Sequence, residues 1–169
     1  MEINKQEIYM RDGDLELRSL EGDDLAYTLS WRNSPDVRKW FLNDAVITEK
    51  AHKDWYHRNL SNDKDIVLIG HGGTTKERVC QVSIYNIDES SATAEVGRFV
   101  SNPRTVGMGF VRRSIILLIE FAFSELEMQE LYLEVKDDNF RAIELYKSLG
   151  FKVTLESEKM LRMGLCRAQ

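Results

Sequence analysis

The chain has 169 residues, of which 43% are hydrophobic and 30% charged, so it can form one domain with its own core. Its 23 basic and 28 acidic side chains give a formal net charge of −5, which argues against a nucleic-acid-binding protein that relies on bulk positive charge. The two cysteines, Cys80 and Cys166, form no CxxC pair and are typical of free thiols in a reducing compartment. The most apolar run, residues 115–123, is too short to span a bilayer. We therefore expect a single domain over residues 1–169 in the cytoplasm, without a membrane or nucleic-acid partner.

The first third of the chain is predicted to contain one strand and three helical segments. Residues 15–20 alternate like a half-buried strand, and residues 22–24 (Gly-Asp-Asp) are suited to cap the helix that follows. Pro35 favours a further helical turn because proline is well placed at the first helical position. Thr48 is an N-cap for a helix through Leu60, and we expect the Leu60 side chain to face inward.

The rest of the chain alternates strands with two helices. An apolar helix is expected from residue 110 to about 126, and a second helix around Tyr146 ends before Gly150. Strands are expected at residues 65–70, 79–87, 92–101, 131–135, 151–156 and 159–165. No repeat or linker divides the chain. The order of the elements is that of an α+β domain with a mixed central sheet.

Two segments carry the pattern of a ligand site. Residues 104–109 read Arg-Thr-Val-Gly-Met-Gly directly before the apolar helix, so main-chain N–H groups and a helix N-terminus can face a phosphate. Thirty residues after this segment, Asn139, Ala142 and Tyr146 lie along one side of the later helix. A glycine-rich turn alone is more often a tight turn without a ligand, so the pairing of the two segments is what matters.

Together, in this order, the two segments resemble the acetyl-CoA site of the GNAT N-acetyltransferase superfamily. Its motif reads Gln/Arg-x-x-Gly-x-Gly/Ala, and its later helix carries a tyrosine. The resemblance implies a GNAT fold, a single domain with a mixed, mostly antiparallel central sheet flanked by helices. That sheet would be splayed between the fourth strand, residues 92–101, and the fifth, residues 131–135. It also implies acetyl-CoA as the cosubstrate of transfer to a primary amine.

The resemblance assigns a set of residues to acetyl-CoA. The residues expected to hold it are Val100, Arg104, Gly107, Met108, Gly109, Phe110, Asn139, Arg141 and Tyr146. The main-chain N–H of Val100 would donate to the acetyl carbonyl and its developing oxyanion. Arg112 would add a charge-assisted contact to phosphate. Asn139 is equally suited to a helix N-cap, and Arg141 to a solvated helix surface.

Two side chains are expected to move protons. Tyr146 would act as the general acid that protonates the CoA thiolate, and Glu95 as the base that deprotonates the amine through water. The competing interpretations are a core tyrosine packed on Phe151 and a carboxylate at a sheet edge that positions the substrate. No serine or cysteine stands in a nucleophile elbow, which favours direct attack in a ternary complex. The three histidines lack the spacing of zinc ligands, so no metal is expected.

The acceptor is expected to meet the N-terminal third. Residues 31–35 read Trp-Arg-Asn-Ser-Pro, and residues 47–52 carry Ile-Thr followed by His52. This pattern resembles bacterial nucleotide-sugar N-acetyltransferases of the pseudaminic-acid pathway, which acetylate a UDP-linked 4-amino-deoxysugar. Carried over, Arg32 and His52 would face the nucleotide diphosphate, and Tyr85 and Asn86 would approach uracil or sugar.

Two other functions remain open at this point. One is a ribosomal-protein N-terminal acetyltransferase, whose basic substrate would suit an acidic enzyme. The other is a CoA-binding module without catalysis. Such a module would be expected to lack Tyr146 or the glycine-rich segment, and this chain has both. Proteins of this superfamily often pair through late strands such as residues 159–165, so a homodimer is one expected assembly.

Overall fold

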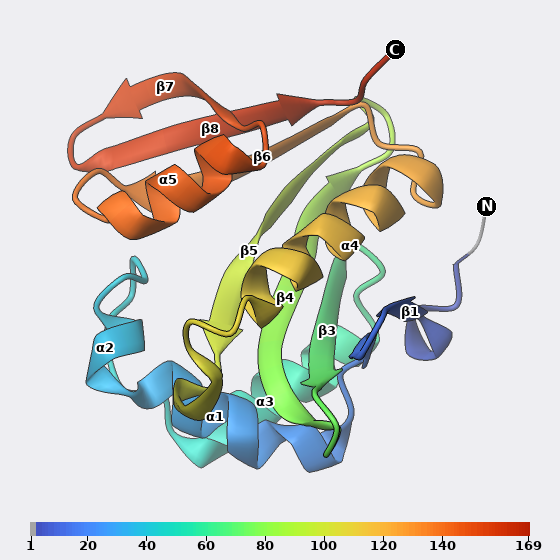
Figure 1. Cartoon of the computed structure of the whole chain (residues 1–169), viewed down its shortest axis with the longest axis vertical. Helices are drawn as coiled ribbons and strands as arrows, with labels where there is room; N and C mark the ends of the chain where they lie inside the picture. Colours follow the sequence, from blue (N-terminus) through green and yellow to red (C-terminus); the bar gives the residue numbers. More distant parts are fainter. Residues whose placement is uncertain (1–2) are drawn as a thin grey trace.

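A single sheet of eight strands organises the computed structural model, which describes residues 3–169. The strand order is β1-β2-β3-β4-β5-β6-β8-β7 (Figure 1). The strands are β1 (Tyr9–Asp12), β2 (Leu15–Ser19), β3 (Asp65–Gly72), β4 (Glu77–Asp88), β5 (Thr93–Ser101), β6 (Glu130–Lys136), β7 (Lys152–Ser157) and β8 (Met160–Cys166). The α-helices are α1 (Leu25–Asn33), α2 (Pro35–Arg38), α3 (Glu49–Leu60), α4 (Phe110–Ser124) and α5 (Phe140–Ser148).

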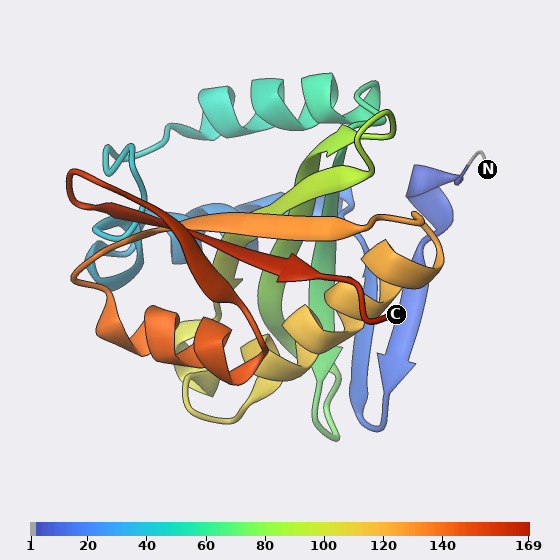
Figure 2. The ribbon, with the colours of Figure 1, turned by 90° about the horizontal axis from the view of Figure 1, so that it is seen from above.

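Helices cover both faces of the sheet, which therefore has two apolar layers. Figure 2 shows α3 on one side of the strands and α4 and α5 on the other. The larger layer packs α4 and α5 against the central strands, and the smaller one joins α1 and α3 to Val67, Ile69 and Val100. Because both of its faces are covered, β3 is buried from Asp65 to Gly70 and reads as a continuous apolar run instead of an alternating strand.

The predicted elements are confirmed in their order, with two differences. The first is β1, four mostly exposed residues that pair with β2 and that local pattern did not indicate. The second concerns α3, where the prediction that Leu60 faces inward is wrong, since its side chain is 37% exposed. This helix instead buries His52 and Asn59, and Asn59 donates to the Asp65 carbonyl at 3.3 Å.

The sheet separates where the fourth and fifth predicted strands meet, which confirms the expected splay. Strand β5 pairs with β6 in parallel over three residues only, and the last pair is Glu95 with Tyr132. Beyond this pair, β6 continues alongside β8 in an antiparallel ladder that runs to Lys136. The C-terminal half of β5 is consequently left without a strand partner on that side, as Figure 1 shows by the divergence of β5 and β6.

Candidate active site

The separation of β5 from β6 opens onto a cavity that both predicted segments line. Its volume is about 740 Å³, within the range of small-molecule sites. One end is formed by the glycine-rich loop and the start of α4, and the middle by β5 and α5. The other end is formed by Arg32 and the segment after α2. A single cavity thus joins the two motifs that the sequence placed thirty residues apart.

The glycine-rich loop is shaped to receive an anion. Gly107 and Gly109 have φ angles of +85° and +82°, which glycine adopts without strain, and a Cβ at either position would meet no atom within 4 Å. Gly109 is the N-cap of α4, so the N–H groups of Phe110, Val111 and Arg112 have no partner inside the helix. These donors and the helix dipole fit a pyrophosphate such as that of CoA.

Two residues assigned to this loop from sequence take no part in the cavity wall. The N–H of Met108 donates to the Thr105 carbonyl at 3.2 Å, and the Met108 side chain is 61% exposed. Arg104 is exposed and is not among the residues that line the cavity, whereas Arg112 is. The charged contact at this end is therefore better placed on Arg112 than on Arg104.

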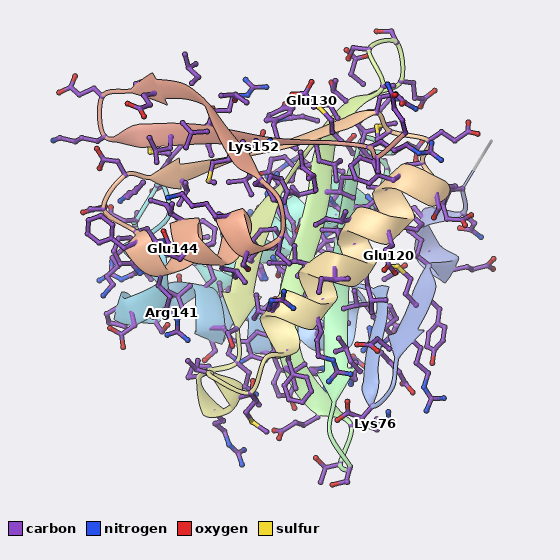
Figure 3. The ribbon with its side chains drawn as sticks, turned by 45° about the horizontal axis from the view of Figure 1, so that its top comes forward. Lys76, Glu120, Glu130, Arg141, Glu144 and Lys152 are labelled. Carbon is purple, nitrogen blue, oxygen red and sulfur yellow. The ribbon has the colours of Figure 1, made fainter. Side chains whose placement is uncertain are left out.

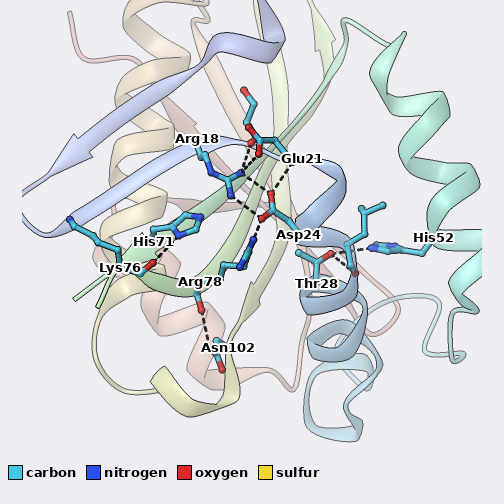
Figure 4. Close-up of polar contacts among 11 residues, drawn as sticks. Arg18, Glu21, Asp24, Thr28, His52, His71, Lys76, Arg78 and Asn102 are labelled. Carbon is cyan, nitrogen blue, oxygen red and sulfur yellow. Dashed lines mark hydrogen bonds and ion pairs between the residues drawn. The ribbon is translucent and has the colours of Figure 1, made fainter. Parts of the chain in front are cut away.

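Hydrogen bonds of Asn102 and Arg78 connect the start of the glycine-rich loop to the buried Asp24 (Figure 4). Asn102 accepts from the Arg104 N–H at 3.0 Å and donates to the Arg78 carbonyl at 2.8 Å. The Arg78 side chain donates at 2.7 Å to Asp24, which is fully buried and also receives two bonds from Arg18. Burial alone would raise the pKa of Asp24, but the bonds from Arg18 and Arg78 outweigh it and lower the pKa. The carboxylate therefore stays charged and links β2 to β4 through Arg18 and Arg78.

The main-chain donors at the open side of β5 follow from its register with β4. The Asn102 N–H donates to the Val79 carbonyl at 2.8 Å, and Val100 pairs with Gln81 two residues earlier on the same ladder. Since N–H groups alternate sides along a regular stretch of strand, the Val100 N–H is directed at β4 and that of Ser101 at the open side. The side chain of Val100 is also buried, at 2% exposure. Val100, the expected oxyanion donor, is not among the residues that line the cavity, whereas its neighbours Phe99 and Ser101 are.

Helix α5 presents the residues expected near the thioester. Asn139 is its N-cap and accepts from the Ala142 N–H at 3.3 Å. Asn139 also lines the cavity, so its place in the fold is compatible both with capping and with the expected contact to acetyl-CoA. Arg141 lies on the same helix (Figure 3) and lines the cavity. The ring of Tyr146 packs on Phe99 and Phe151, with centroids 5.9 and 6.2 Å away. Burial raises the pKa of Tyr146, so its phenol stays protonated and can act as a donor.

Glu95 faces the cavity from β5, at the last residue paired with β6. Its Oε1 accepts from the Tyr85 hydroxyl at 3.1 Å, and its Oε2 accepts from Asn86 at 2.9 Å. Tyr85 lines the cavity, whereas Asn86 reaches it only through this carboxylate. The two residues that the sequence assigned to the acceptor are thus partners of Glu95.

The far end of the cavity holds an arginine, Arg32, that forms no ion pair with any carboxylate of residues 3–169. The Arg32 guanidinium lies 4.0 Å over the Phe41 ring and donates to the Asn43 carbonyl, while its Nη1 is buried and unpaired. Burial, and then the charge of Arg38, lower the pKa of Arg32, and Asp44 opposes them. Within residues 3–169, no carboxylate oxygen lies within 4.0 Å of either guanidinium.

His52, expected beside Arg32, lies elsewhere. Its side chain is buried between α1 and α3, where Nε2 is 3.0 Å from the Thr28 hydroxyl (Figure 4). The ring stacks on Trp55 at 5.2 Å, and burial lowers the pKa of His52. It is not among the residues that line the cavity. The groups in contact with Arg32 are instead Phe41 and Asn43, and Trp40 lines the same cavity; the sequence pattern indicated none of the three.

Comparison with known proteins agrees with this geometry. A family model described as an acetyltransferase (GNAT) domain matches residues 14–152. The chain belongs to the GNAT acetyltransferase family. It is 26% identical over 141 residues to a spermidine N(1)-acetyltransferase of Escherichia coli, covering 82% of this chain and 73% of that protein. It is 31% identical over 131 residues to an N-acetyltransferase 9-like protein of Caenorhabditis briggsae, covering 72% of this chain and 66% of that protein.

The fold of this GNAT acetyltransferase has a well-matched solved counterpart. The spermidine N-acetyltransferase of Vibrio cholerae, in complex with CoA and spermine, superimposes with a TM-score of 0.83 at 20% identity, covering 92% of this chain and 96% of that one. The GNAT fold, N-acetyltransferase activity and acetyl-CoA as cosubstrate are thereby confirmed. None of the relatives described here is named for a nucleotide sugar, so the comparisons do not support that acceptor. Within residues 3–169, no helix is long and apolar enough to cross a bilayer.

Proposed function

We propose that this GNAT acetyltransferase acetylates a primary amine on an acceptor that also carries an anionic group, of the class of nucleotide-linked amino sugars. The observation that carries the proposal is Arg32, a cavity-lining guanidinium with a buried, unpaired Nη1 and no carboxylate oxygen of residues 3–169 within 4.0 Å. A buried donor without a partner costs free energy, and an acceptor phosphate would supply that partner. Phe41, in contact with Arg32, and Trp40, in the wall of the same cavity, offer aromatic surface to a base or a sugar ring.

The proposed mechanism divides the work among groups that already meet in the cavity. When bound, acetyl-CoA supplies the activated acetyl thioester. Glu95 takes a proton from the attacking amine through water, and the nitrogen then bonds to the carbonyl carbon. The main-chain N–H of Ser101 stabilises the negative charge on the carbonyl oxygen. As the carbon–sulfur bond breaks, Tyr146 gives its phenolic proton to the sulfur, which leaves as the thiol.

The charges that line the cavity favour an anionic acceptor over a polyamine. Among the described residues that line the cavity, Glu95 and Glu134 are the carboxylates, and Glu95 already accepts two hydrogen bonds. A polyamine would bring several positive charges toward Arg32, and like charges at short range repel. A diphosphate would be attracted to the same guanidinium.

A polyamine acceptor is the second candidate, favoured by the names of the Escherichia coli and Vibrio cholerae relatives. In that case Glu95 and Glu134 would bind ammonium groups, and Arg32 would have a structural role. Arg32→Ala distinguishes the two acceptors. Loss of the guanidinium should raise KM for a UDP-linked amino sugar at least tenfold, equivalent to about 1.4 kcal/mol, and leave KM for acetyl-CoA unchanged.

The matched control is Arg58→Ala, which removes an exposed arginine of α3 that does not line the cavity. It should change neither KM. An equal rise in KM for the amino sugar and for acetyl-CoA would contradict the proposed acceptor. So would an Arg32→Ala enzyme that turns over spermidine faster while its turnover of the amino sugar is unchanged.

A further inference from the structure

We propose that Tyr85 is a positioning residue for the Glu95 carboxylate, and that Arg98, anchored by Asp65, holds the Tyr85 ring in place. The inference rests on the proposed function, in which Glu95 receives the proton of the amine. It adds a chain of side chains, drawn from β3, β4 and β5, that fixes where this carboxylate stands in the cavity.

The first contact is between two facing residues of neighbouring strands. Tyr85 and Glu95 are directly paired across β4 and β5, so their side chains leave the sheet on the same face. The Tyr85 hydroxyl donates to Oε1 at 3.1 Å, and Asn86 donates to Oε2 at 2.9 Å. Each carboxylate oxygen keeps a further lone pair for water or an amine. The two donors thus fix the carboxylate without blocking it.

The second contact holds the tyrosine ring. The Arg98 guanidinium lies 3.9 Å from the centroid of the Tyr85 ring, and its Nη1 donates to both oxygens of the buried Asp65 at 2.9 and 2.8 Å. Arg98 itself has a φ of +52°, at a register shift between β4 and β5. A non-glycine residue in this region is strained, and such strain persists only where the surroundings impose it. The ion pair with Asp65 is one such constraint, because it holds the Arg98 side chain against the Tyr85 ring.

The third element is the absence of a side chain opposite the hydroxyl. A Cβ at Gly97 would stand 2.7 Å from the Tyr85 hydroxyl oxygen, closer than real Cβ contacts. Glycine at this position therefore keeps the space in which the phenol reaches Glu95. Burial, and then the negative charge of Glu95, raise the pKa of Tyr85, so its phenol remains a hydrogen-bond donor at physiological pH.

The test is Tyr85→Phe, which keeps the ring under Arg98 and removes only the hydroxyl. We expect kcat to fall about tenfold, because Glu95 loses the hydrogen bond that positions it, and KM for acetyl-CoA to stay unchanged, because that bond lies outside the CoA end. Tyr27→Phe is the matched control. Its ring also lies under an arginine, Arg78, at 4.3 Å, but it does not line the cavity. This control should leave kcat unchanged.

A double-mutant cycle with Glu95→Gln decides whether Tyr85 acts through Glu95. If it does, Tyr85→Phe costs nothing further in the Glu95→Gln background, because the carboxylate it positions is already absent. Independent, multiplying losses would overturn the positioning role, as would a Tyr85→Phe variant with full kcat and a raised acceptor KM. If Glu95→Gln alone retains full kcat, the failure is that of the proposed base and not of the contact between the two residues.

Discussion

Gly72→Ala is expected to damage the acetyl-CoA end of the site although Gly72 does not line the cavity. A Cβ at Gly72 would lie 2.5 Å from Cε1 of the Phe110 ring and 2.9 Å from its Cδ1 and Cζ. Carbon atoms in contact normally stand about 3.5–4.0 Å apart, so the ring has to move by roughly 1 Å. Phe110 is 6% exposed and is the first residue of α4, so its ring anchors the N–H groups that follow the two glycines.

The magnitude follows from overpacking. Extra volume in a well-packed core costs about 1–3 kcal/mol, and at this chain length each kcal/mol lowers the melting temperature by about 2–4 °C. We expect a decrease of roughly 2–12 °C by calorimetry. If one hydrogen bond to phosphate is lost as well, at about 1.5 kcal/mol, KM for acetyl-CoA rises about tenfold.

The comparison variant is Gly22→Ala, because a Cβ at Gly22 meets no atom within 4 Å and the φ angle is not in the left-handed region. It should leave both quantities unchanged. A Gly72→Ala protein with native melting temperature would refute the packing argument. A destabilised protein with native KM for acetyl-CoA would refute the link between Phe110 and the loop.

Three further predictions concern single side chains. Tyr146→Phe should lower kcat at least tenfold with little change in CoA binding, as measured by steady-state kinetics and calorimetric titration, and an unchanged kcat would contradict the acid role. A thiol reagent at pH 8 should label Cys166 at once and Cys80 only after unfolding, because burial raises the pKa of Cys80 to about 11; rapid labelling of both would contradict its burial. Because burial lowers the pKa of His52 below 6.5, the native state binds fewer protons than the unfolded state, and stability should fall as the pH drops below 6.5. His52→Gln should reduce that slope in urea unfolding, and an identical slope would contradict this contribution.

The parts of the fold that local chemistry determines could be predicted from sequence. Thr48 accepts from the Ala51 N–H at 3.1 Å, as an N-cap should. The loop around Gly107 and Gly109 precedes α4 as its motif indicated, because positive φ angles and a helix start are properties of adjacent residues. Strand β1 escaped prediction because its four residues are largely exposed and carry no alternating apolar pattern.

The parts that depend on distant partners could not be predicted. The direction of the Val100 N–H is set by its register with β4 and by the irregularity at Arg98, neither of which has a local signature. His52 follows Thr48 in the pattern of the nucleotide-sugar enzymes, yet its position depends on Thr28 across the helix pair. That the Arg32 Nη1 is buried without a hydrogen-bond partner likewise depends on how the elements pack and has no signature in the sequence.

The most direct test of the proposed function is release of free CoA from acetyl-CoA in the presence of single acceptors. The acceptors are a UDP-4-amino-4,6-dideoxysugar, spermidine, and a peptide that begins with alanine or serine, with mass spectrometry of the acetylated product. We expect turnover of the UDP-linked amino sugar at a higher kcat/KM than of spermidine or the peptide. Turnover of spermidine or the peptide alone would contradict the proposed acceptor.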